Sequence, residues 1–256
     1  MTETLITLHN LSVHYGNRHA LQDVSGTFHQ GSLTAVAGPN GSGKSTLLKV
    51  IAGVIKPDSG SIEFHQGNNR AMAYLPQTAH MQRDFPTSVE EVVVTGFYPH
   101  LGEWKAIRHS HRDLARKALQ EVGLAGYKDR QISELSGGEF QRTLFARVIV
   151  QDAPIILLDE PFTAVDAETT ARLIRLLLKW HQEGRTVICV LHDLLLIQKY
   201  FPESMVLQGK CLGSGHTHKL FEQKLLSFDL DMAELYPVDR DSPHNHTHNH
   251  THNHDA

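Results

Sequence analysis

The segment Gly38-Pro-Asn-Gly-Ser-Gly-Lys-Ser45 constrains the fold more than any other feature, because it matches the phosphate-loop pattern G-x-x-x-x-G-K-[ST]. Such a loop needs a buried strand before it and a helix after it, so that backbone N–H groups can surround phosphates. An apolar run predicts a strand over Leu33–Ala37, and helical spacing predicts a helix over Ser45–Ala52. We therefore expect an α/β fold in which this strand belongs to a largely parallel sheet.

Strand and helix patterns alternate through the second half of the chain, as a parallel sheet requires. Apolar strands are predicted over Ile155–Leu158 and Thr186–Leu191, with a long helix over Glu168–Gln182 between them. Near the other end, alternation over Ile6–Tyr15 and the turn signal Gly16-Asn17 predict an antiparallel hairpin. The chain therefore combines a parallel sheet with a separate antiparallel element.

Two further regions stand apart from these patterns. Helical spacing dominates about residues 87–141, where Gly96–Gly102 is predicted to be an aromatic surface loop. The low-complexity run Pro243–His254 is expected to be disordered without a ligand. We thus divide the chain into a folded domain over residues 1–238, with a helical subdomain inserted at about 87–141, and a histidine-rich tail over 239–256.

The composition excludes several classes of protein. Hydrophobic residues make up 40% and charged residues 20%, and the net charge of −4 gives no support to nucleic-acid binding. No stretch approaches the roughly 18 apolar residues that cross a bilayer, and the N-terminus lacks a signal-peptide pattern. Cys189 falls in an apolar run and reads as a core residue, and Cys211 is the other cysteine. A disulfide framework is not expected, and a reducing cytoplasm fits best.

The phosphate loop carries the residues for binding a nucleotide. Lys44 would place a cation on the β and γ oxygens, and the Ser45 hydroxyl suits Mg²⁺. The predicted loop contacts are Gly38, Pro39, Asn40, Gly41, Ser42, Gly43, Lys44, Ser45 and Thr46.

The segment Ile155-Ile-Leu-Leu-Asp-Glu-Pro161 is an apolar strand that ends in two acids. Ligands bind at the carboxyl ends of strands in open α/β sheets, although paired acids can also be solvated surface. We expect Asp159 to hold Mg²⁺, through water, and Glu160 to orient and deprotonate the attacking water.

Between these motifs lies Leu135-Ser-Gly-Gly-Glu-Phe-Gln-Arg142. Ser136 and Glu139 have capping-box spacing, so a helix should begin there, and the two glycines let a phosphate approach its free N–H groups. An ordinary capped helix without a ligand would show the same capping pattern.

The order of these motifs resembles the ABC ATPases over roughly residues 5–225. Gln77 resembles the glutamine of the family's Q-loop, Ala164-Val-Asp166 the D-loop, His192 the switch histidine and Tyr15 the aromatic that stacks on adenine. Taken singly, Gln77, His192 or Tyr15 would more often be structural, and only their order and spacing favour these roles. The resemblance implies a RecA-like phosphate-loop core with an antiparallel β subdomain and a helical subdomain.

The same resemblance implies a mechanism. Two copies pair head to tail, so that ATP held by one phosphate loop meets Ser136, Gly137 and Gly138 of the other copy. Catalysis would rest on Glu160, His192, Gln77 and Lys44, and Mg²⁺ on Ser45, Gln77 and Asp159.

A transporter subunit is favoured over two soluble alternatives from the same superfamily. Chromosome and DNA-repair ATPases insert long coiled coils between the phosphate loop and the family's signature motif, which Leu135–Arg142 resembles. Translation factors carry two cassettes, and this chain has neither feature. Asp84–Gly102 is similar to the corresponding stretch of ATPases for manganese, zinc, iron, iron-chelate and cobalamin uptake. The resemblance implies integral permease subunits, an extracytoplasmic metal-binding protein and a peripheral position on the cytoplasmic membrane face. Phe85, Phe97 and Tyr98 are candidates for the permease contact, with core packing as the alternative for each.

The tail bears on the cargo. It carries six histidines at alternate positions, His244, His246, His248, His250, His252 and His254. Neutral imidazole is the commonest ligand of Zn²⁺, and a flexible chain can supply three or four of them. An engineered tag and an inert tail are the alternatives. We expect zinc as the cargo, with manganese, iron or an iron chelate as alternatives, and Zn²⁺ binding to the tail. The pairs His109/His111 and His216/His218 are weaker metal candidates.

Overall fold

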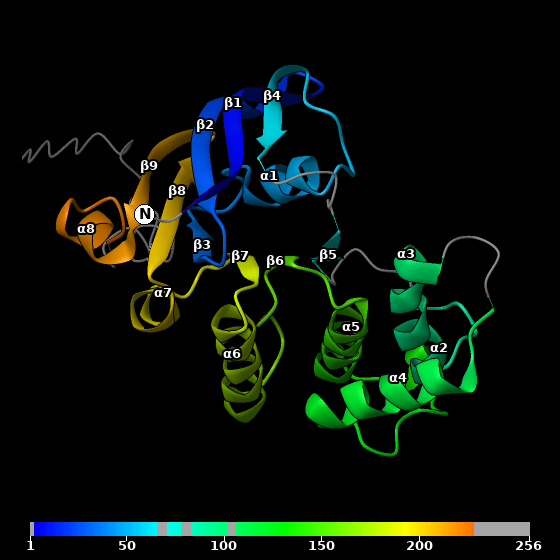
Figure 1. Cartoon of the computed structure of the whole chain (residues 1–256). Coiled ribbons are helices and arrows are strands. Elements are labelled where there is room, and N and C mark those ends of the chain that lie inside the picture. Colours follow the sequence, from blue (N-terminus) through cyan, green and yellow to red (C-terminus); the bar gives the residue numbers. More distant parts are fainter. Residues whose placement is uncertain (1–2, 66–70, 78–82, 102–105, 228–256) are drawn as a thin grey trace, which may run out of the picture.

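The computed structural model describes residues 3–65, 71–77, 83–101 and 106–227 (Figure 1). The predicted tail and its six histidines lie outside these residues, so the boundaries 1–238 and 239–256 stay predictions. The α/β fold with an antiparallel β subdomain and a helical subdomain is confirmed.

A six-stranded sheet lies at the centre of the described part of the chain. Its order is β5–β6–β7–β3–β8–β9, and neighbouring strands are parallel except for the antiparallel pair β8–β9. The strands are β3 (Leu33–Ala37), β5 (Met72–Leu75), β6 (Ile155–Asp159), β7 (Thr186–Val190), β8 (Glu203–Gln208) and β9 (Lys210–His216). The three strands predicted for this sheet are therefore confirmed to within a residue at each end.

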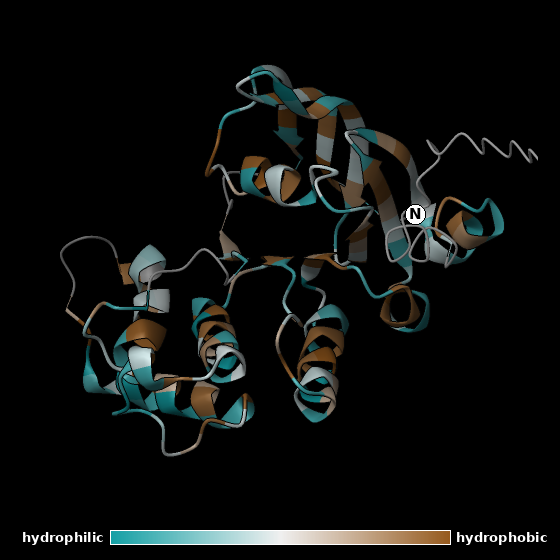
Figure 2. Ribbon diagram, turned by 180° about the vertical axis from the view of Figure 1, so that it is seen from behind, coloured by the Kyte–Doolittle hydropathy of each residue, from teal (hydrophilic) through white to brown (hydrophobic). Residues whose placement is uncertain are grey.

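The central strands are apolar on both faces because both faces are covered, and they appear largely brown in Figure 2. Alternate residues of β6 point to opposite sides: Ile155 and Leu157 join one hydrophobic cluster, Ile156 and Leu158 the other. Cys189 of β7 is fully buried, as predicted. This pattern is typical of a parallel sheet with cover on both faces.

The first cover is an antiparallel sheet. Strands β1 (Thr4–Tyr15), β2 (Arg18–His29) and β4 (Ser59–Phe64) pair in the order β2–β1–β4. Helix α1 (Lys44–Ile51) lies between this sheet and the central one (Figure 1). Buried residues of β1, β2, α1 and the central strands form one continuous core, so the phosphate loop before α1 is held between the two sheets.

Helices cover the opposite face. They are α5 (Gly137–Gln151), α6 (Ala167–Gln182) and α7 (Leu194–Tyr200), with α8 (Thr217–Glu222) at the edge beside β9. Helix α5 is continuous through Gln141, so the expected end of the helical subdomain at that residue falls inside a helix.

The remaining helices form the helical subdomain. They are α2 (Val89–Val94), η2 (Thr95–Phe97), α3 (Tyr98–Leu101), α4 (His109–Glu121) and the short η3 (Ile132–Glu134). Of these, α2, η2 and α4 pack on α5. The predicted surface loop over Gly96–Gly102 is wrong, because residues up to Leu101 are helical. This segment packs closely on α5 instead of extending into solvent, since a Cβ on Gly96 would lie 2.5 Å from the carbonyl oxygen of Arg147.

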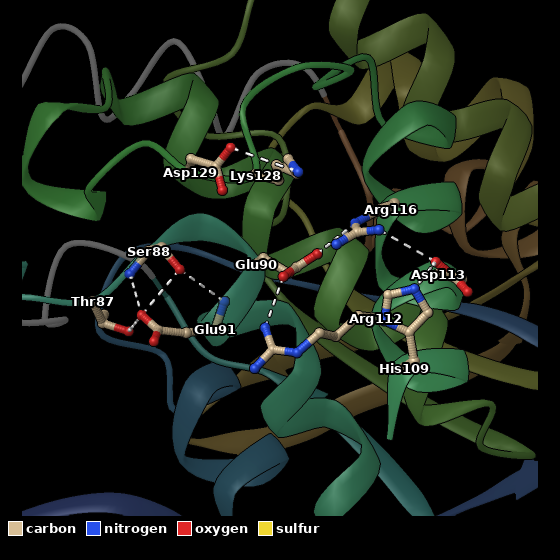
Figure 3. A network of polar contacts seen from close by, with 10 residues as sticks. All are labelled: Thr87, Ser88, Glu90, Glu91, His109, Arg112, Asp113, Arg116, Lys128 and Asp129. Atoms are coloured by element: carbon tan, nitrogen blue, oxygen red, sulfur yellow. Dashed lines mark hydrogen bonds and ion pairs between the residues drawn. The ribbon is translucent and has the colours of Figure 1, made fainter. Parts of the chain in front are cut away.

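A buried carboxylate fixes α2 to α4 (Figure 3). Glu90 accepts hydrogen bonds from Arg112 Nη1 at 2.8 Å and Arg116 Nε at 2.7 Å. Burial alone would raise the pKa of Glu90, but the two guanidinium groups outweigh it and lower the pKa. Ser88 and Glu91 form a capping box at the start of the same helix. These contacts fix the first turn of α2 on both sides.

No helix among the described residues is long and apolar enough to cross a membrane.

Candidate active site

The phosphate loop passes so close to its neighbours that two of its glycines have no room for a side chain. A Cβ on Gly38 would lie 2.0 Å from the carbonyl oxygen of Leu207, and one on Gly43 2.2 Å from that of Ala20. Both residues also have positive φ angles, 146° and 97°, which side chains disfavour. The loop therefore lies directly against β8 and β2, and α1 begins at Lys44.

Lys44 is folded back on its own loop. Its ammonium group donates to the carbonyl oxygens of Gly38 at 2.7 Å and Pro39 at 2.8 Å, and the residue is buried. A buried ammonium group needs partners, and phosphate oxygens are stronger acceptors than neutral carbonyls. The expected phosphate contact thus requires only that this side chain exchange partners.

Ser45 and Asp159 meet across α1 and β6. The Ser45 hydroxyl donates to Asp159 Oδ1 at 2.8 Å, and Asp159 is only 1% exposed. Burial raises the pKa of Asp159 despite that hydrogen bond. A hydroxyl beside a buried carboxylate is an oxygen donor set that suits a hard divalent cation such as Mg²⁺, whose charge would favour the ionised carboxylate.

Glu160 lies between the two residues expected to act with it. Its Oε2 accepts from Gln77 Nε2 at 2.8 Å, and its Oε1 lies 2.9 Å from His192 Nε2. The His192 contact lowers the pKa of Glu160 in spite of partial burial. The backbone of Glu160, directly after the end of β6 at Asp159, adopts a positive φ of 51°. The carboxylate is thus ionised at neutral pH and able to accept a proton.

Lys44, Ser45, Gln77 and Glu160 line one cleft of about 400 Å³, whereas His192 lines an adjoining hollow that it shares with Glu160. Tyr15 lines it and is 52% exposed, so its ring is available for stacking. The rest of the described lining is Arg18, Ala20, Asn40, Gly41, Ser42, Gly43, Lys44, Ser45, Thr46, Gln77 and Glu160. Arg18 and Ala20 were not predicted. The register of β1 on β2, which pairs Tyr15 with Arg18, is the signal that would have found Arg18.

The signature residues Ser136, Gly137 and Gly138 do not line this cleft. The Ser136 hydroxyl caps α5 by accepting from Glu139 N at 3.2 Å, and Glu139 Oε2 accepts from Ser136 N at 2.8 Å. The predicted capping box is therefore confirmed. A Cβ on Gly138 would lie 3.1 Å from the carbonyl oxygen of Ala164, so the signature packs on the Ala164–Asp166 segment of its own chain.

Gln141 links helix α5 to the segment that follows β6, and its sequence position gave no sign of this. Its Nε2 donates to the carbonyl oxygen of Pro161 at 3.0 Å, and the residue is 1% exposed. Pro161 directly follows Glu160. The geometry of α5 thus bears on the position of Glu160.

The three aromatic residues predicted to contact the permease differ in exposure. Phe85 and Tyr98 are 71% and 54% exposed, whereas Phe97 is 8% exposed and its ring lies 4.8 Å from that of His111. Core packing, the alternative given for Phe97, therefore holds for that residue.

Among the described residues, the two predicted histidine pairs are not grouped as a metal site. His111 Nδ1 accepts from Arg108 N, which makes it a helix cap. Within the described ranges, no three His, Cys, Asp or Glu side chains are grouped to hold a metal.

Comparisons with known proteins agree with this geometry. Residues 21–163 match the family described as ABC transporter. The chain is 38% identical over 228 residues to the manganese transport system ATP-binding protein MntA of Synechocystis sp., covering 86% of this chain and 88% of that protein. It is 38% identical over 229 residues to the zinc transport system ATP-binding protein TroB of Treponema pallidum, covering 87% and 85%. Its structure resembles the dimeric structure of MJ0796, a bacterial ABC transporter cassette, with a TM-score of 0.73, 26% identity, and 83% and 99% coverage.

Proposed function

This chain belongs to the ABC transporter ATPase family, and from that premise we propose that it hydrolyses ATP to drive metal-ion uptake through separate membrane subunits. The observation that carries the hydrolytic part is the ionised Glu160 carboxylate, held between Gln77 and His192. It lies in the cleft that also contains the phosphate loop.

In this proposal the residues of the site have separate roles. The loop N–H groups and Lys44 hold the triphosphate, and Tyr15 stacks on the base. Ser45, Asp159 and Gln77 would hold Mg²⁺, which supplies positive charge to the β and γ oxygens when bound. Glu160 takes a proton from the attacking water, and His192 keeps the carboxylate oriented.

The active form is proposed to be a head-to-tail pair. In a single chain the signature residues stay outside the cleft, although the free N–H groups at the start of α5 suit a phosphate. A second copy would bring its Ser136, Gly137 and Gly138 to the open side of the cleft. The solved relative described as dimeric supports the pairing of two copies.

The membrane partner is proposed to contact the helical subdomain. Phe85 and Tyr98 are large exposed aromatic side chains on the segment that follows Gln77. Such residues are enriched at protein interfaces. This docking would hold the chain as a peripheral protein at the cytoplasmic face of the membrane.

Zinc is our proposed cargo, with manganese, iron or an iron chelate as alternatives. The relatives named for manganese and zinc are equally similar, so the preference comes from the histidine tail. The same tail is proposed to bind Zn²⁺. Zinc titration of a chain ending at Asp241 should show fewer bound ions than the full chain; equal stoichiometry would contradict this role.

Reconstitution tests the transport role. The full chain is co-purified with its membrane partners, placed in vesicles, and supplied with ATP and each metal in turn. We expect Zn²⁺ accumulation that Glu160→Gln abolishes. Accumulation of another metal would overturn zinc, and co-purification with DNA or ribosomes instead of membrane proteins would overturn transport.

A further inference from the structure

We propose that Arg18 is a nucleotide-binding residue and contacts the α-phosphate of ATP. Neither the phosphate-loop pattern nor the resemblance assigns it a role. The inference rests on the proposed function, because it concerns the same cleft.

The position of Arg18 follows from the hairpin that carries Tyr15. Strand β1 ends at Tyr15 and β2 begins at Arg18, and the two residues are cross-strand partners. Both line the nucleotide cleft. Directly opposed residues on one antiparallel pair lie close together, so Arg18 is next to the ring that would stack on the base.

The guanidinium group of Arg18 already reaches the phosphate loop. Its Nη2 donates to the carbonyl oxygen of Gly41 at 3.2 Å. A Cβ on Gly41 would lie 2.5 Å from that same nitrogen, so the guanidinium lies directly over the loop. The side chain therefore connects the Tyr15 side of the cleft to the loop that surrounds the phosphates.

The distribution of charge in the cleft indicates which phosphate Arg18 would contact. Among its described lining residues, Arg18 and Lys44 are the cations and Glu160 is the anion. Lys44 lies at the carbonyls of Gly38 and Pro39, and Arg18 lies at that of Gly41. With the base on Tyr15, the phosphate nearest Arg18 is the one attached to the nucleoside.

Binding would exchange a neutral acceptor for a charged one. Arginine presents a planar set of donors that matches phosphate oxygens, and such charge-assisted hydrogen bonds are stronger than bonds to carbonyls. Arg18 is exposed, so solvent and salt weaken the gain. We expect its removal to weaken nucleotide binding by about tenfold at low salt.

The test measures affinities of the full chain for ATP, ADP, AMP and adenosine without Mg²⁺, by displacement of a fluorescent ATP analogue. Arg18→Ala is compared with wild type, with Arg18→Lys, and with Lys219→Ala, which removes an exposed cation from α8. Thermal melting checks that each variant folds. Arg18→Ala should weaken ATP, ADP and AMP about equally and leave adenosine unchanged. Arg18→Lys should restore part of the loss, and Lys219→Ala should show none.

Steady-state kinetics give a second readout, since Arg18→Ala should raise KM for ATP while kcat stays close to wild type. Unchanged affinities, a loss shared by adenosine, or a loss confined to ATP would each overturn the α-phosphate contact. If wild type itself fails to bind ATP, the proposed function fails. If wild type binds ATP and Arg18→Ala binds it equally, only the inference about Arg18 fails.

Discussion

Replacing Glu160 with glutamine removes a charge while keeping a side chain of the same shape between two partners. The carboxylate accepts from Gln77 at 2.8 Å and lies 2.9 Å from His192 Nε2, and an amide can occupy the same position. The His192 contact keeps the pKa of Glu160 low, so wild type presents an ionised base at neutral pH and the variant presents none. Loss of a general base typically lowers turnover by about 10²–10⁴-fold, or about 3–5 kcal/mol on the barrier.

Binding should survive that change. The contacts of Lys44 with the loop and of Ser45 with Asp159 do not involve Glu160. We therefore expect ATP affinity and melting temperature close to wild type, and an ATP-bound dimer that accumulates because it is not hydrolysed.

Phosphate release at saturating ATP measures the turnover, and size-exclusion chromatography with ATP measures the dimer. Glu222→Gln is the matched control, since that glutamate lies on α8 with a side chain 64% exposed. Turnover of Glu160→Gln within a few-fold of wild type would show that another group accepts the proton. A variant that loses both turnover and ATP binding would assign Glu160 to binding instead.

Three further outcomes are expected. Gly43→Ala should abolish ATP binding and lower the melting temperature, because its Cβ would lie 2.2 Å from the carbonyl oxygen of Ala20; calorimetry that detects normal binding would contradict this close packing. Ser136→Ala should lower the free energy of unfolding by about 1 kcal/mol because the helix cap is lost. It should also reduce ATP hydrolysis while the single chain keeps its affinity for ATP. Ser136→Thr, which keeps a capping hydroxyl, is the comparison. Glu90→Gln should lower the free energy of unfolding by about 1 kcal/mol, or about 2–4 °C in Tm. Because the two guanidinium groups lower the pKa of Glu90 despite burial, this stabilisation is present above the ordinary pKa of a glutamate, near 4.3, and is lost as the pH falls through the lower folded value. Melting curves of wild type and Glu90→Gln should therefore converge in acid, and a constant difference would contradict the ion pair.

The parts of the fold that the sequence predicted are those with a single local cause. An uninterrupted apolar run can only be a strand buried on both faces or part of a buried helix, and length distinguished these for Leu33–Ala37. The capping box of Ser136 was likewise visible, because both of its partners lie within one helical turn.

The failures have long-range causes. Gly96 and the proline at position 99 indicated a loop, but the backbone of α5 presses against Gly96 and the segment forms helical turns. Arg18 was missed because its place in the cleft depends on the register of β1 on β2, and Gln141 because its partner is a backbone carbonyl twenty residues away. Propensity and motif spacing contain neither kind of information.

The bond from Gln141 to Pro161 would couple ATP hydrolysis in one copy to hydrolysis in the other. In the proposed head-to-tail pair, each chain would hold one cleft and contribute its signature motif to the other, and this bond connects the two parts within one chain. A change in the position of Glu160 in one cleft would then move helix α5, whose first residues would face the neighbouring cleft. In such a pair, hydrolysis in one cleft would therefore affect hydrolysis in the other.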